Sequence, residues 1–446
     1  MDAAQTVTPQ APDTDFTFKL RRERPDATAY YVLSKFQKWL LVAILAGSLV
    51  WLAFDHILYL TVVNGIFTTF YLVICGYKFY LINLSLGSQR EMRFAPEELG
   101  RLRDEELPVY SILVPLYRET ESLPRLVAGL QGLDYPKDKL DVQLLLEEDD
   151  KPTVEAARAM TMPPFVRVVV VPHSFPKTKP KACNYGLANA RGKYLVIYDA
   201  EDKPEPDQIK KAILGFRQSP SDVICLQAKL NFYNPRQNIL TRWFTIEYSM
   251  WFDLFLPGLD YVSAPIPLGG TSNHFDLAKL KELMGWDPFN VTEDCDLGVR
   301  IAALRYGTKT IDSTTWEEAC SDLGFWIRQR SRWTKGYLQT YLVHNRKPWQ
   351  LFRTLGFGNW LSFHLMVGGT PISLLLNPVY WLMTVVWFVF RWEWLSQLFP
   401  FPIILWGILC LFVGNFVFVY SCMLAAYRRG YFDLVKDGLL MPVCWM

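Results

Sequence analysis

Long apolar runs enclose a central stretch of this chain in which short apolar runs alternate with polar segments. The first two long runs, 39–54 and 57–76, are separated only by Asp55 and His56. Each comes close to the roughly 20 apolar residues that a helix needs to span a bilayer. We therefore predict a transmembrane helical hairpin over residues 39–82, with a very short turn between its two helices.

The apolar pattern returns after residue 348 and predicts three further segments. Residues 349–370 are apolar but are interrupted by arginine, glycine and asparagine, so we expect an interfacial helix there. The long runs within 371–426 predict a pair of transmembrane helices. Residues 427–446 then form a cytosolic loop and the start of an apolar segment that is too short to cross a membrane.

The central stretch, 83–348, has the pattern of a folded α/β domain. Its short apolar runs predict buried strands at 109–117, 141–148, 166–171 and 194–199, and mixed segments at 122–133 and 181–192 predict helices. The order β-α-β-β-α-β favours a sheet with parallel strand pairs. Polar residues gather where these strands end, which is where such sheets bind ligands.

The distribution of basic residues predicts how the chain is oriented in a membrane. Lysine and arginine are frequent within residues 1–38, follow the first hairpin, and occur again after residue 427. By the positive-inside rule, the N-terminal tail, the α/β domain and the C-terminal segment all face the cytoplasm. Residues 1–18 are polar and rich in Pro, Thr and Asp, so we expect part of the tail to be disordered.

The composition supports a chain with both membrane and soluble parts. Hydrophobic residues make up 51% and aromatic residues 15% of the chain, yet 20% of the residues are charged. The formal net charge of +2 provides no global basic field, so we expect no nucleic acid partner. The 8 cysteines form no CxxC pair, which argues against both a disulfide framework and a zinc site.

An acidic segment, 198-YDAEDKPEPD-207, directly follows the last predicted strand. Carboxylates two residues apart on an extended backbone, such as Asp199 and Glu201, face the same side and suit a hard cation such as Mg²⁺ or Mn²⁺. Asp202 lies beside them, and such a cation would bridge the phosphates of a nucleotide-sugar. The alternative is a solvated acidic loop that two prolines close.

Three further segments allow both a functional and a structural interpretation. The acids of 144-LLLEEDD-150 crowd at a strand end, where a cation or a ligand with N–H donors would relieve their repulsion. The lysines of 177-KTKPKACNYG-186 either meet phosphates at a helix start or form a solvated loop. In 291-VTEDCDLG-298, Thr292 either caps a helix or stands beside a carboxylate that acts as a general base.

The segment 329-QRSRWTKG-336 places basic residues around Trp333. Arginine binds phosphate oxygens in a bidentate manner, and a tryptophan ring stacks on the apolar face of a sugar. The alternatives are a solvated helix face, a basic patch that holds lipid headgroups, and a nucleic-acid patch. A diphosphate donor together with a sugar acceptor accounts for the mixture of cations and indole better than lipid headgroups alone.

Taken in order, these segments resemble the processive family 2 glycosyltransferases, membrane synthases related to cellulose, curdlan and hyaluronan synthases. The resemblance covers roughly residues 35–430 and rests on five strings: 115-PLYRE-119, 147-EEDD-150, 199-DAED-202, 292-TED-294 and 329-QRSRW-333. The Q-x-x-R-W motif that marks polymerising members is intact. The family implies a GT-A-like, Rossmann-related mixed sheet in a cytosolic α/β domain, inserted between transmembrane helices and accompanied by interfacial helices.

The resemblance also implies roles for particular residues. The donor UDP-sugar would be bound by Pro115, Tyr117, Glu119, Asp149, Asp150, Lys179, Asp199, Gln329 and Arg332. The metal would be held by Asp199 with Glu201 or Asp202, and Asp294 would be the general base within the motif Thr292, Glu293 and Asp294. The growing polysaccharide would be bound by Trp333 and by the loop residues Gly270, Thr271, Ser272 and Asn273.

We therefore expect a multi-pass inner-membrane enzyme that polymerises a sugar, with glucose as the first choice, into a β-linked polysaccharide and feeds it into a channel. Membrane lipids surround it, and a second copy or a partner subunit would complete the channel. Two alternatives are single-sugar transfer to a polyprenyl phosphate and a non-catalytic membrane scaffold. This chain departs from the family by carrying Glu201 in the D-x-D position and by lacking a PilZ-like R-x-x-x-R tail after the last predicted span.

Overall fold

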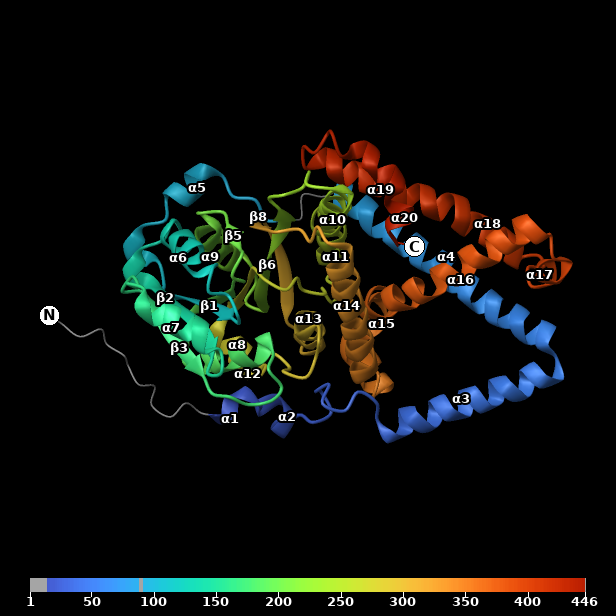
Figure 1. The fold of residues 1–446 in the computed structure, drawn as a ribbon, viewed down its shortest axis with the longest axis horizontal. Helices are drawn as coiled ribbons and strands as arrows, with labels where there is room; N and C mark the ends of the chain where they lie inside the picture. The colour runs from blue at the N-terminus through green and yellow to red at the C-terminus, as the bar shows by residue number, and fades with distance from the viewer. Residues whose placement is uncertain (1–13, 88–90, 446) are drawn as a thin grey trace.

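The computed structural model describes residues 14–87 and 91–445 of the chain. An α/β domain occupies one end of the molecule, and long helices project from the other end (Figure 1). Within the predicted disordered segment, residues 1–13 lie outside the described part. The prediction is wrong for the remainder, because α1 (Thr14–Thr17) is helical and Phe16 is buried.

In the described part of the chain, eight strands form one mixed sheet in the order β3-β2-β1-β4-β7-β6-β8-β5. The strands are β1 (Tyr110–Leu116), β2 (Leu140–Glu147), β3 (Val166–Val171), β4 (Tyr194–Ile197), β5 (Lys203–Pro204), β6 (Val223–Phe232), β7 (Asn273–Asp276) and β8 (Gly307–Glu317). The first four in the sheet order run parallel, β7 is antiparallel to both of its neighbours, and β6 and β8 are again parallel. The predicted mixed α/β fold is thus confirmed.

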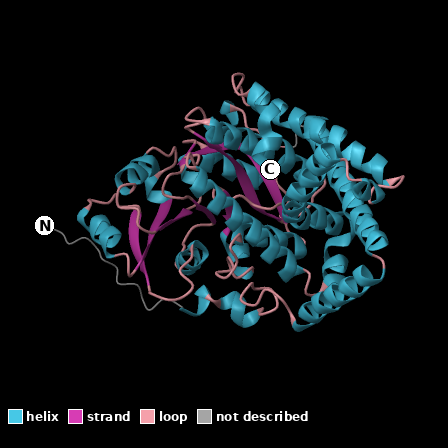
Figure 2. Cartoon of the chain, turned by 45° about the vertical axis from the view of Figure 1, so that its right-hand side comes forward, coloured by secondary structure: helices cyan, strands magenta, loops and turns pink. Residues whose placement is uncertain are grey.

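Helices cover both faces of this sheet, as Figure 2 shows. The helices of the domain are α5 (Pro96–Gly100), α6 (Leu123–Gln131), α7 (Lys151–Ala159), α8 (Lys179–Ala188), α9 (Gln208–Gln218), α10 (Ile239–Met250), α11 (Leu256–Tyr261), α12 (Leu277–Glu282), α13 (Glu293–Ala303) and α14 (Leu323–His344). Because strand side chains alternate, Ile112 of β1 packs with α6, α7 and α9, whereas Leu113 packs with α8 on the other face.

The four strands predicted from apolar runs are all present, each within a few residues of its predicted limits. The sequence pattern did not reveal β8, whose central residues are mostly threonine, serine and aspartate. Thr315 of β8 is nevertheless fully buried, because β6 and β5 pair on either side of that strand. Its hydroxyl accepts a hydrogen bond from Gln208 Nε2 at 3.1 Å, which satisfies the buried polar group.

Among the described residues, four helical stretches are long and apolar enough to cross a membrane: Lys35–Phe54, His56–Gly87, Pro348–Phe390 and Ile403–Arg428. They consist of α3 (Lys35–Phe54), α4 (His56–Gly87), α15 (Pro348–Phe363), α16 (Gly369–Phe390), α18 (Ile403–Leu409) and α19 (Asn415–Arg428), with π-helical turns at His364–Gly368 and Cys410–Gly414. Large apolar side chains on these helices are exposed, including Phe54 at 86% and Phe416 at 69%. Such a surface suits a membrane protein.

Only Asp55 separates α3 from α4, as the predicted short turn requires, and its carboxylate accepts a hydrogen bond from the Leu58 N–H at 2.9 Å. The two helices diverge from this turn in Figure 1. The segment predicted as a separate interfacial helix runs on through a π-helical turn into α16 as one stretch of 43 residues. Gly356 interrupts that stretch with a φ of 73°, a conformation that glycine adopts without steric cost.

Buried charges join the end of the last long helix to the sheet. Lys229 of β6 lies 3.1 Å from Asp253 and 2.7 Å from Asp312, and it also pairs with Glu91. Arg429, which directly follows α19, donates from Nε to Asp253 Oδ2 at 2.5 Å. Since removing one partner of a buried ion pair leaves an uncompensated charge, this network fixes the helix end to the domain.

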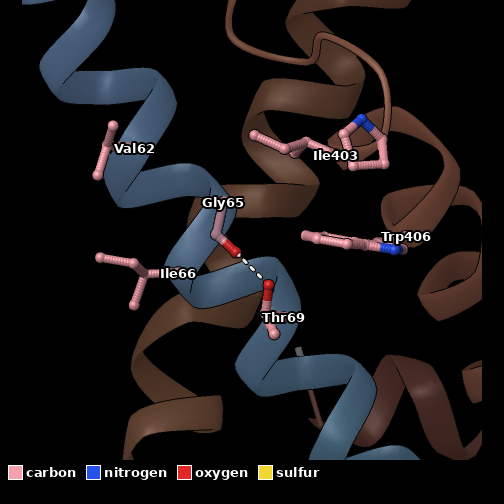
Figure 3. Close-up of a pocket in the computed structure, with 7 residues that line it drawn as sticks. Val62, Gly65, Ile66, Thr69, Ile403 and Trp406 are labelled. Atoms are coloured by element: carbon pink, nitrogen blue, oxygen red, sulfur yellow. Dashed lines mark hydrogen bonds between the residues drawn. The ribbon is translucent and has the colours of Figure 1, made fainter.

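One cavity lies between the long helices α4 and α18 (Figure 3). It has a volume of about 490 Å³ and is lined by Val62, Gly65, Ile66, Thr69, Pro402, Ile403 and Trp406. The Thr69 hydroxyl already donates to the Gly65 carbonyl at 2.7 Å. The lining therefore provides apolar packing and none of the acids and lysines that the sequence singles out for chemistry.

The close approach of α11 to α4 generates a stability prediction. A Cβ atom built on Gly258 would lie 2.5 Å from the carbonyl oxygen of Leu81, at the domain end of α4. We expect Gly258→Ala to destabilise the protein by about 1–3 kcal/mol, the usual cost of overpacking. Thermal unfolding in detergent, monitored by circular dichroism, measures the change.

Gly129→Ala is the matched control, because that position lies on an exposed face of α6 and an added Cβ would meet nothing within 4 Å. It should leave the stability unchanged or raise it slightly. Equal unfolding temperatures for the two variants would show that α11 and α4 are not in close contact.

Candidate active site

The loops that follow β1, β2 and β4 meet at one edge of the sheet. These three strands are parallel neighbours, so their carboxyl ends lie on the same side. The sequence strings 115-PLYRE-119, 147-EEDD-150 and 199-DAED-202 are therefore neighbours in space. This edge is where the pattern of polar residues predicts a ligand site.

A cavity of about 380 Å³ lies between the loops after β1 and β2 and is lined by Tyr117, Arg118, Thr120, Asp149, Asp150 and Pro152. The buried Asp150 carboxylate accepts a hydrogen bond from the Arg118 N–H at 2.5 Å and so holds the two loops together. Asp149 pairs with Lys177 and lies 3.8 Å from His173. The cavity has the size of a small-molecule site and a polar lining.

Two other residues predicted to bind the donor support this cavity from outside its lining. Pro115 belongs to β1, where it stands opposite Leu145 of β2. Glu119 Oε2 accepts a hydrogen bond from the Ser122 hydroxyl at 2.6 Å, just before α6 begins. Both residues help to set the path of the loop that carries Tyr117.

Lys179, the first residue of α8, links the acidic loop after β4 to the loop before β7. Its Nζ lies 2.5 Å from Asp199 Oδ1 and donates a hydrogen bond to the Gly270 carbonyl at 2.8 Å. Burial disfavours the charged ammonium, but Asp199 and Glu293 outweigh this effect and raise the pKa of Lys179 above its usual value. Lys179 therefore stays charged among the acids.

Asp202 has a structural part in this loop. It is buried, and its Oδ2 accepts hydrogen bonds from the Asp199 N–H at 2.7 Å and from the Thr271 hydroxyl. Its Oδ1 is also buried but has no hydrogen-bond partner within the described residues. Burial, followed by the charge of Asp199, raises the pKa of Asp202 well above its usual value.

Glu201 differs from Asp202 because it is exposed at the mouth of the cluster. An exposed carboxylate beside Asp199 is free to turn toward a ligand, whereas Asp202 is held by its loop contacts. Across residues 14–87 and 91–445, no group of three or more His, Cys, Asp or Glu side chains is arranged to hold a metal ion. Instead, the Asp199 carboxylate forms an ion pair with the Lys179 ammonium.

A cation nevertheless fits the donor set of this loop. The unpartnered oxygen of Asp202, the exposed Glu201 and the Asp199 carboxylate are all hard oxygen ligands of the kind that Mg²⁺ and Mn²⁺ prefer. Lys179 and such a cation would compete for the Asp199 carboxylate. Glu201 and Asp202 are the two candidates for the second carboxylate ligand.

The sequence reasoning missed one carboxylate of this cluster, Glu317 at the end of β8. Burial, followed by the nearby charges of Asp202 and Asp199, raises the pKa of Glu317 well above its usual value. Its backbone carbonyl accepts a hydrogen bond from the Tyr233 N–H at 3.0 Å, which keeps β8 beside β6. An acid near the end of a threonine-rich segment carries no signal that would have identified it.

The Thr292, Glu293 and Asp294 motif lies at the start of α13, directly beside Gly270. A Cβ atom built on Gly270 would lie 3.6 Å from Asp294 Oδ2, and the other oxygen of Asp294 accepts a hydrogen bond from the Cys295 N–H at 2.7 Å. Thr292 precedes the helix, as the capping interpretation predicts, yet its buried hydroxyl has no hydrogen-bond partner within the described residues.

The acids of α13 have pKa values suited to proton transfer. Burial raises the pKa of both Glu293 and Asp294, and the charge of Asp294 raises that of Glu293 further. A carboxylate with a raised pKa accepts a proton more readily than an ordinary one, which is the property of a general base. Asp294 is the better placed of the two because one of its oxygens lies against Gly270.

The Q-x-x-R-W motif lies on α14, which packs closely against the motif at the start of α13. A Cβ atom built on Gly336 of α14 would lie 2.4 Å from Thr292 Cγ2. Gln329 is half-buried, and its Oε1 has no hydrogen-bond partner among the described residues, while Arg332 is exposed. Arg332 is therefore accessible from outside, whereas the Gln329 Oε1 atom is buried and unpaired within the described residues.

Trp333 is half-buried in an aromatic cluster that includes Phe244 and Trp326. Arg330 lies over its ring at 4.9 Å and pairs with Glu247 through both guanidinium nitrogens. Since Arg330 is committed to Glu247, Arg332 is the arginine of this segment that remains free for an anionic ligand. The indole is therefore partly covered by packing and partly exposed.

The loop predicted to bind the acceptor is only partly available. Thr271, Ser272 and Asn273 are buried, and their side chains bond within the sheet, for example from the Thr271 hydroxyl to the Ile197 carbonyl at 2.9 Å. Sheet formation accounts for this, because β7 begins at Asn273. Gly270 alone is exposed, beside Lys179 and Asp294.

The contrast between Asp202 and Glu201 generates a stability prediction. Asp202→Asn replaces an oxygen that accepts hydrogen bonds from Asp199 and Thr271 in the interior, so we expect a loss of about 1–3 kcal/mol in unfolding free energy. Glu201→Gln, the control in the same loop, should change the stability by less than about 0.5 kcal/mol because its side chain is exposed. Urea or thermal unfolding in detergent distinguishes the two, and an Asp202→Asn protein as stable as wild type would refute the structural role.

Two family models match this chain, one described as "Glycosyl transferase family 2" over residues 111–272 and one described as "Glycosyl transferase family group 2" over residues 194–420. The first range holds the donor cavity and the acidic loop. The second reaches from β4 through the Q-x-x-R-W helix into the long apolar helices. Together they cover every element that contributes to the candidate site.

Several named proteins are similar to this chain. A probable glycosyltransferase, YdaM, of Bacillus subtilis is 27% identical over 237 residues, which are 52% of this chain and 56% of that protein. Glucomannan 4-beta-mannosyltransferase 2 of Arabidopsis thaliana is 26% identical over 315 residues, 64% of this chain and 57% of that protein. The catalytic subunit of cellulose synthase 1 of Komagataeibacter xylinus is 26% identical over 280 residues, 60% and 36% respectively.

The chain spans 56% and 57% of the length of the first two of these relatives and 36% of the third. They include enzymes named for the synthesis of mannan and cellulose chains, so the predicted relation to processive polysaccharide synthases is confirmed at the level of the family. The model over residues 194–420 covers half of the sequence together with the Thr292, Glu293 and Asp294 motif and the Q-x-x-R-W helix. This chain therefore belongs to the family 2 glycosyltransferases.

Proposed function

We propose that this enzyme is an inverting, processive glycosyltransferase of the inner membrane that extends a β-linked polysaccharide from a UDP-sugar. The observation that carries the proposal is the meeting of Lys179, Asp199, Gly270 and Asp294 at one point. This point lies between the polar cavity after β1 and β2 and the Q-x-x-R-W helix. A donor in the cavity and an acceptor at the helix would meet there.

The donor would bind with its nucleoside in the cavity and its diphosphate toward Lys179. Lys179 would exchange the Asp199 carboxylate for a phosphate oxygen, since both are anionic acceptors for an ammonium. Arg332 would reach the diphosphate from α14, because Arg330 is held by Glu247. Asp199, with Glu201 or Asp202, would then hold a divalent cation, which when bound supplies charge stabilisation for the leaving diphosphate.

Asp294 would act as the general base in a single displacement. The acceptor hydroxyl gives its proton to Asp294 while its oxygen forms a bond to the anomeric carbon. The bond from that carbon to the diphosphate oxygen breaks at the same time, and UDP leaves with the electron pair. A single displacement inverts the anomeric centre, and the raised pKa of Asp294 favours the proton transfer.

The acceptor would lie along α14, with its terminal sugar stacked on the exposed part of Trp333. The membrane helices would then receive the growing polymer, with the α/β domain on the cytoplasmic side. Purified protein supplied with Mg²⁺ or Mn²⁺ and a panel of UDP-sugars and nucleotide-mannose donors tests the proposal. Polymer that linkage-specific hydrolases digest supports it, whereas a single sugar on a polyprenyl phosphate would replace it by lipid glycosylation.

The cation site generates a prediction for the acidic loop. We expect Asp199→Asn to lower turnover by about a hundredfold or more, because an amide cannot offset the charge of a cation that contributes several kcal/mol. Glu201→Gln should weaken Mn²⁺ binding in the presence of UDP, measured by calorimetry, more than Asp202→Asn does. Asp207→Asn, in the same segment but paired with Lys211, is the control and should bind Mn²⁺ normally. A larger loss for Asp202→Asn would assign the second ligand to Asp202.

The packing of Trp333 generates a prediction about elongation. We expect Trp333→Ala to leave UDP affinity unchanged and to reduce polymer synthesis far more than hydrolysis of the donor by water. Arg332→Ala should instead reduce the rate of transfer to any acceptor by about ten- to a hundredfold. This is the rate effect of losing one charge-assisted hydrogen bond that stabilises the transition state. Calorimetry with UDP and product sizing by gel filtration measure both effects.

Trp326→Ala is the matched control, because Trp326 belongs to the same aromatic cluster and also lies under Arg330, at 5.2 Å. It should lower stability in a similar way without changing the ratio of elongation to hydrolysis. If Trp326→Ala and Trp333→Ala change that ratio equally, Trp333 serves packing alone and the acceptor lies elsewhere.

A further inference from the structure

The segment between the N-terminal tail and α3, residues 16–34, lies across the α/β domain, and we refer to it as the strap. Several of its side chains are buried, among them Phe16, Leu20 and Thr28. The Thr17 carbonyl accepts a hydrogen bond from Asn184 Nδ2 of α8 at 3.2 Å. The strap is therefore an integral part of the domain rather than a free tail.

The strap holds the loop that leads into the general-base motif. The Thr28 hydroxyl donates to Asp287 Oδ1 at 2.8 Å, and the Ala29 N–H donates to Asp287 Oδ2 at 2.5 Å. Asp287 is fully buried, so these two bonds satisfy a carboxylate that has no access to water. The Tyr30 ring packs edge-on against Phe289 at 4.9 Å, which adds an apolar contact to the same loop.

The strap also holds the C-terminal end of the Q-x-x-R-W helix. Arg346, just beyond α14, donates to the Asp26 carbonyl at 2.9 Å and to the Val32 carbonyl at 3.4 Å. Lys347 pairs with the Asp26 carboxylate at 2.8 Å. The strap thus contacts both elements that flank the reacting groups, the 285–290 loop and α14.

These two elements are joined to each other beside the general base. Asn290 Nδ2 donates to the Thr340 hydroxyl at 2.9 Å, and the Val291 N–H donates to Gln339 Oε1 at 3.1 Å. His344 of α14 lies 2.9 Å from the buried carboxylate of Asp296 in α13. A shift of the loop or of α14 would therefore move the start of α13, which carries Asp294.

We propose that the strap positions the general base against the Q-x-x-R-W helix, with Thr28, Asp287 and Arg346 as positioning residues. The proposed effect of the strap on catalysis rests on the proposed function, whereas its proposed effect on the position of the loop and of α13 does not. Because Ser34 caps α3 directly after the strap, the same segment connects the first membrane helix to the reacting centre. The strap orients these groups without touching the substrate.

Thr28→Val tests the proposal, because valine has nearly the shape of threonine but lacks the hydroxyl that Asp287 accepts. Hydrogen exchange, measured by mass spectrometry, should rise in peptides that cover residues 285–300 and stay unchanged in β1 and β2. The kcat should fall about tenfold at an unchanged KM for the donor, since misplacing a reacting group acts on the chemical step. Thr28→Ser keeps the hydroxyl and should restore both quantities.

Glu23→Gln is the control within the strap, because Glu23 is exposed and pairs with Lys19 of the strap, at 3.8 Å. It should leave exchange and turnover unchanged. The proposal would be overturned if hydrogen exchange in residues 285–300 is unchanged in Thr28→Val. It would also be overturned if the kcat of that variant falls only as much as its fraction of folded protein. A wild-type protein without turnover would refute the proposed function, while raised exchange in the variant would still support the structural part.

Discussion

The crowding of carboxylates at one edge of the sheet is the constraint on which the site depends. The acids that converge there are Asp199, Glu201, Asp202, Glu293, Asp294 and Glu317. Like charges at such short range repel strongly when water is partly excluded. The Lys179 ammonium lies among them and offsets part of their charge. Its contacts to Asp199 and to the Gly270 carbonyl also connect three loops through polar interactions that an apolar side chain could not make.

This arrangement concentrates negative charge at one edge of the sheet. Acids whose charged forms are disfavoured by burial and by their neighbours have a high affinity for cations and protons. A donor that brings a diphosphate with its cation would satisfy the acids and release Lys179 to a phosphate oxygen. The repulsion that would destabilise an empty acidic loop thus becomes affinity for the donor complex, and the raised pKa of Asp294 suits it for accepting a proton.

The membrane helices are attached to this centre by polar contacts rather than by apolar surface alone. The buried network of Lys229, Asp253 and Arg429 fixes the end of α19 to the sheet, and the close contact of Gly258 with α4 fixes a second helix. The strap joins α3 to the loop before the Thr292, Glu293 and Asp294 motif through Asp287. Because these contacts are directional, they specify one orientation of the domain relative to the helices.

The sequence alone determined the four parallel strands, the apolar helices and the family, because these depend on local hydrophobic patterns and on short strings such as 329-QRSRW-333. It also singled out Asp199 and Glu201 as candidates, because acids directly after a strand have a recognisable local context, whereas Asp294 was singled out by the resemblance to the family. It did not reveal Glu317, the commitment of Arg330 to Glu247, or the burial of Thr271 to Asn273. It also assigned part of the strap to disorder.

Only the tertiary structure decided these last features, because each depends on a contact between residues far apart in the chain. Thr28 and Asp287 are 259 positions apart, and Arg330 and Glu247 are 83 apart, so no local pattern reports their pairing. The predicted disordered segment overlaps the strap at residues 16–18, which are ordered by distant contacts such as that of the Thr17 carbonyl with Asn184 of α8. Farther along the strap, Asp287 and Arg346 satisfy backbone and hydroxyl groups of residues 26–32 and order that part as well.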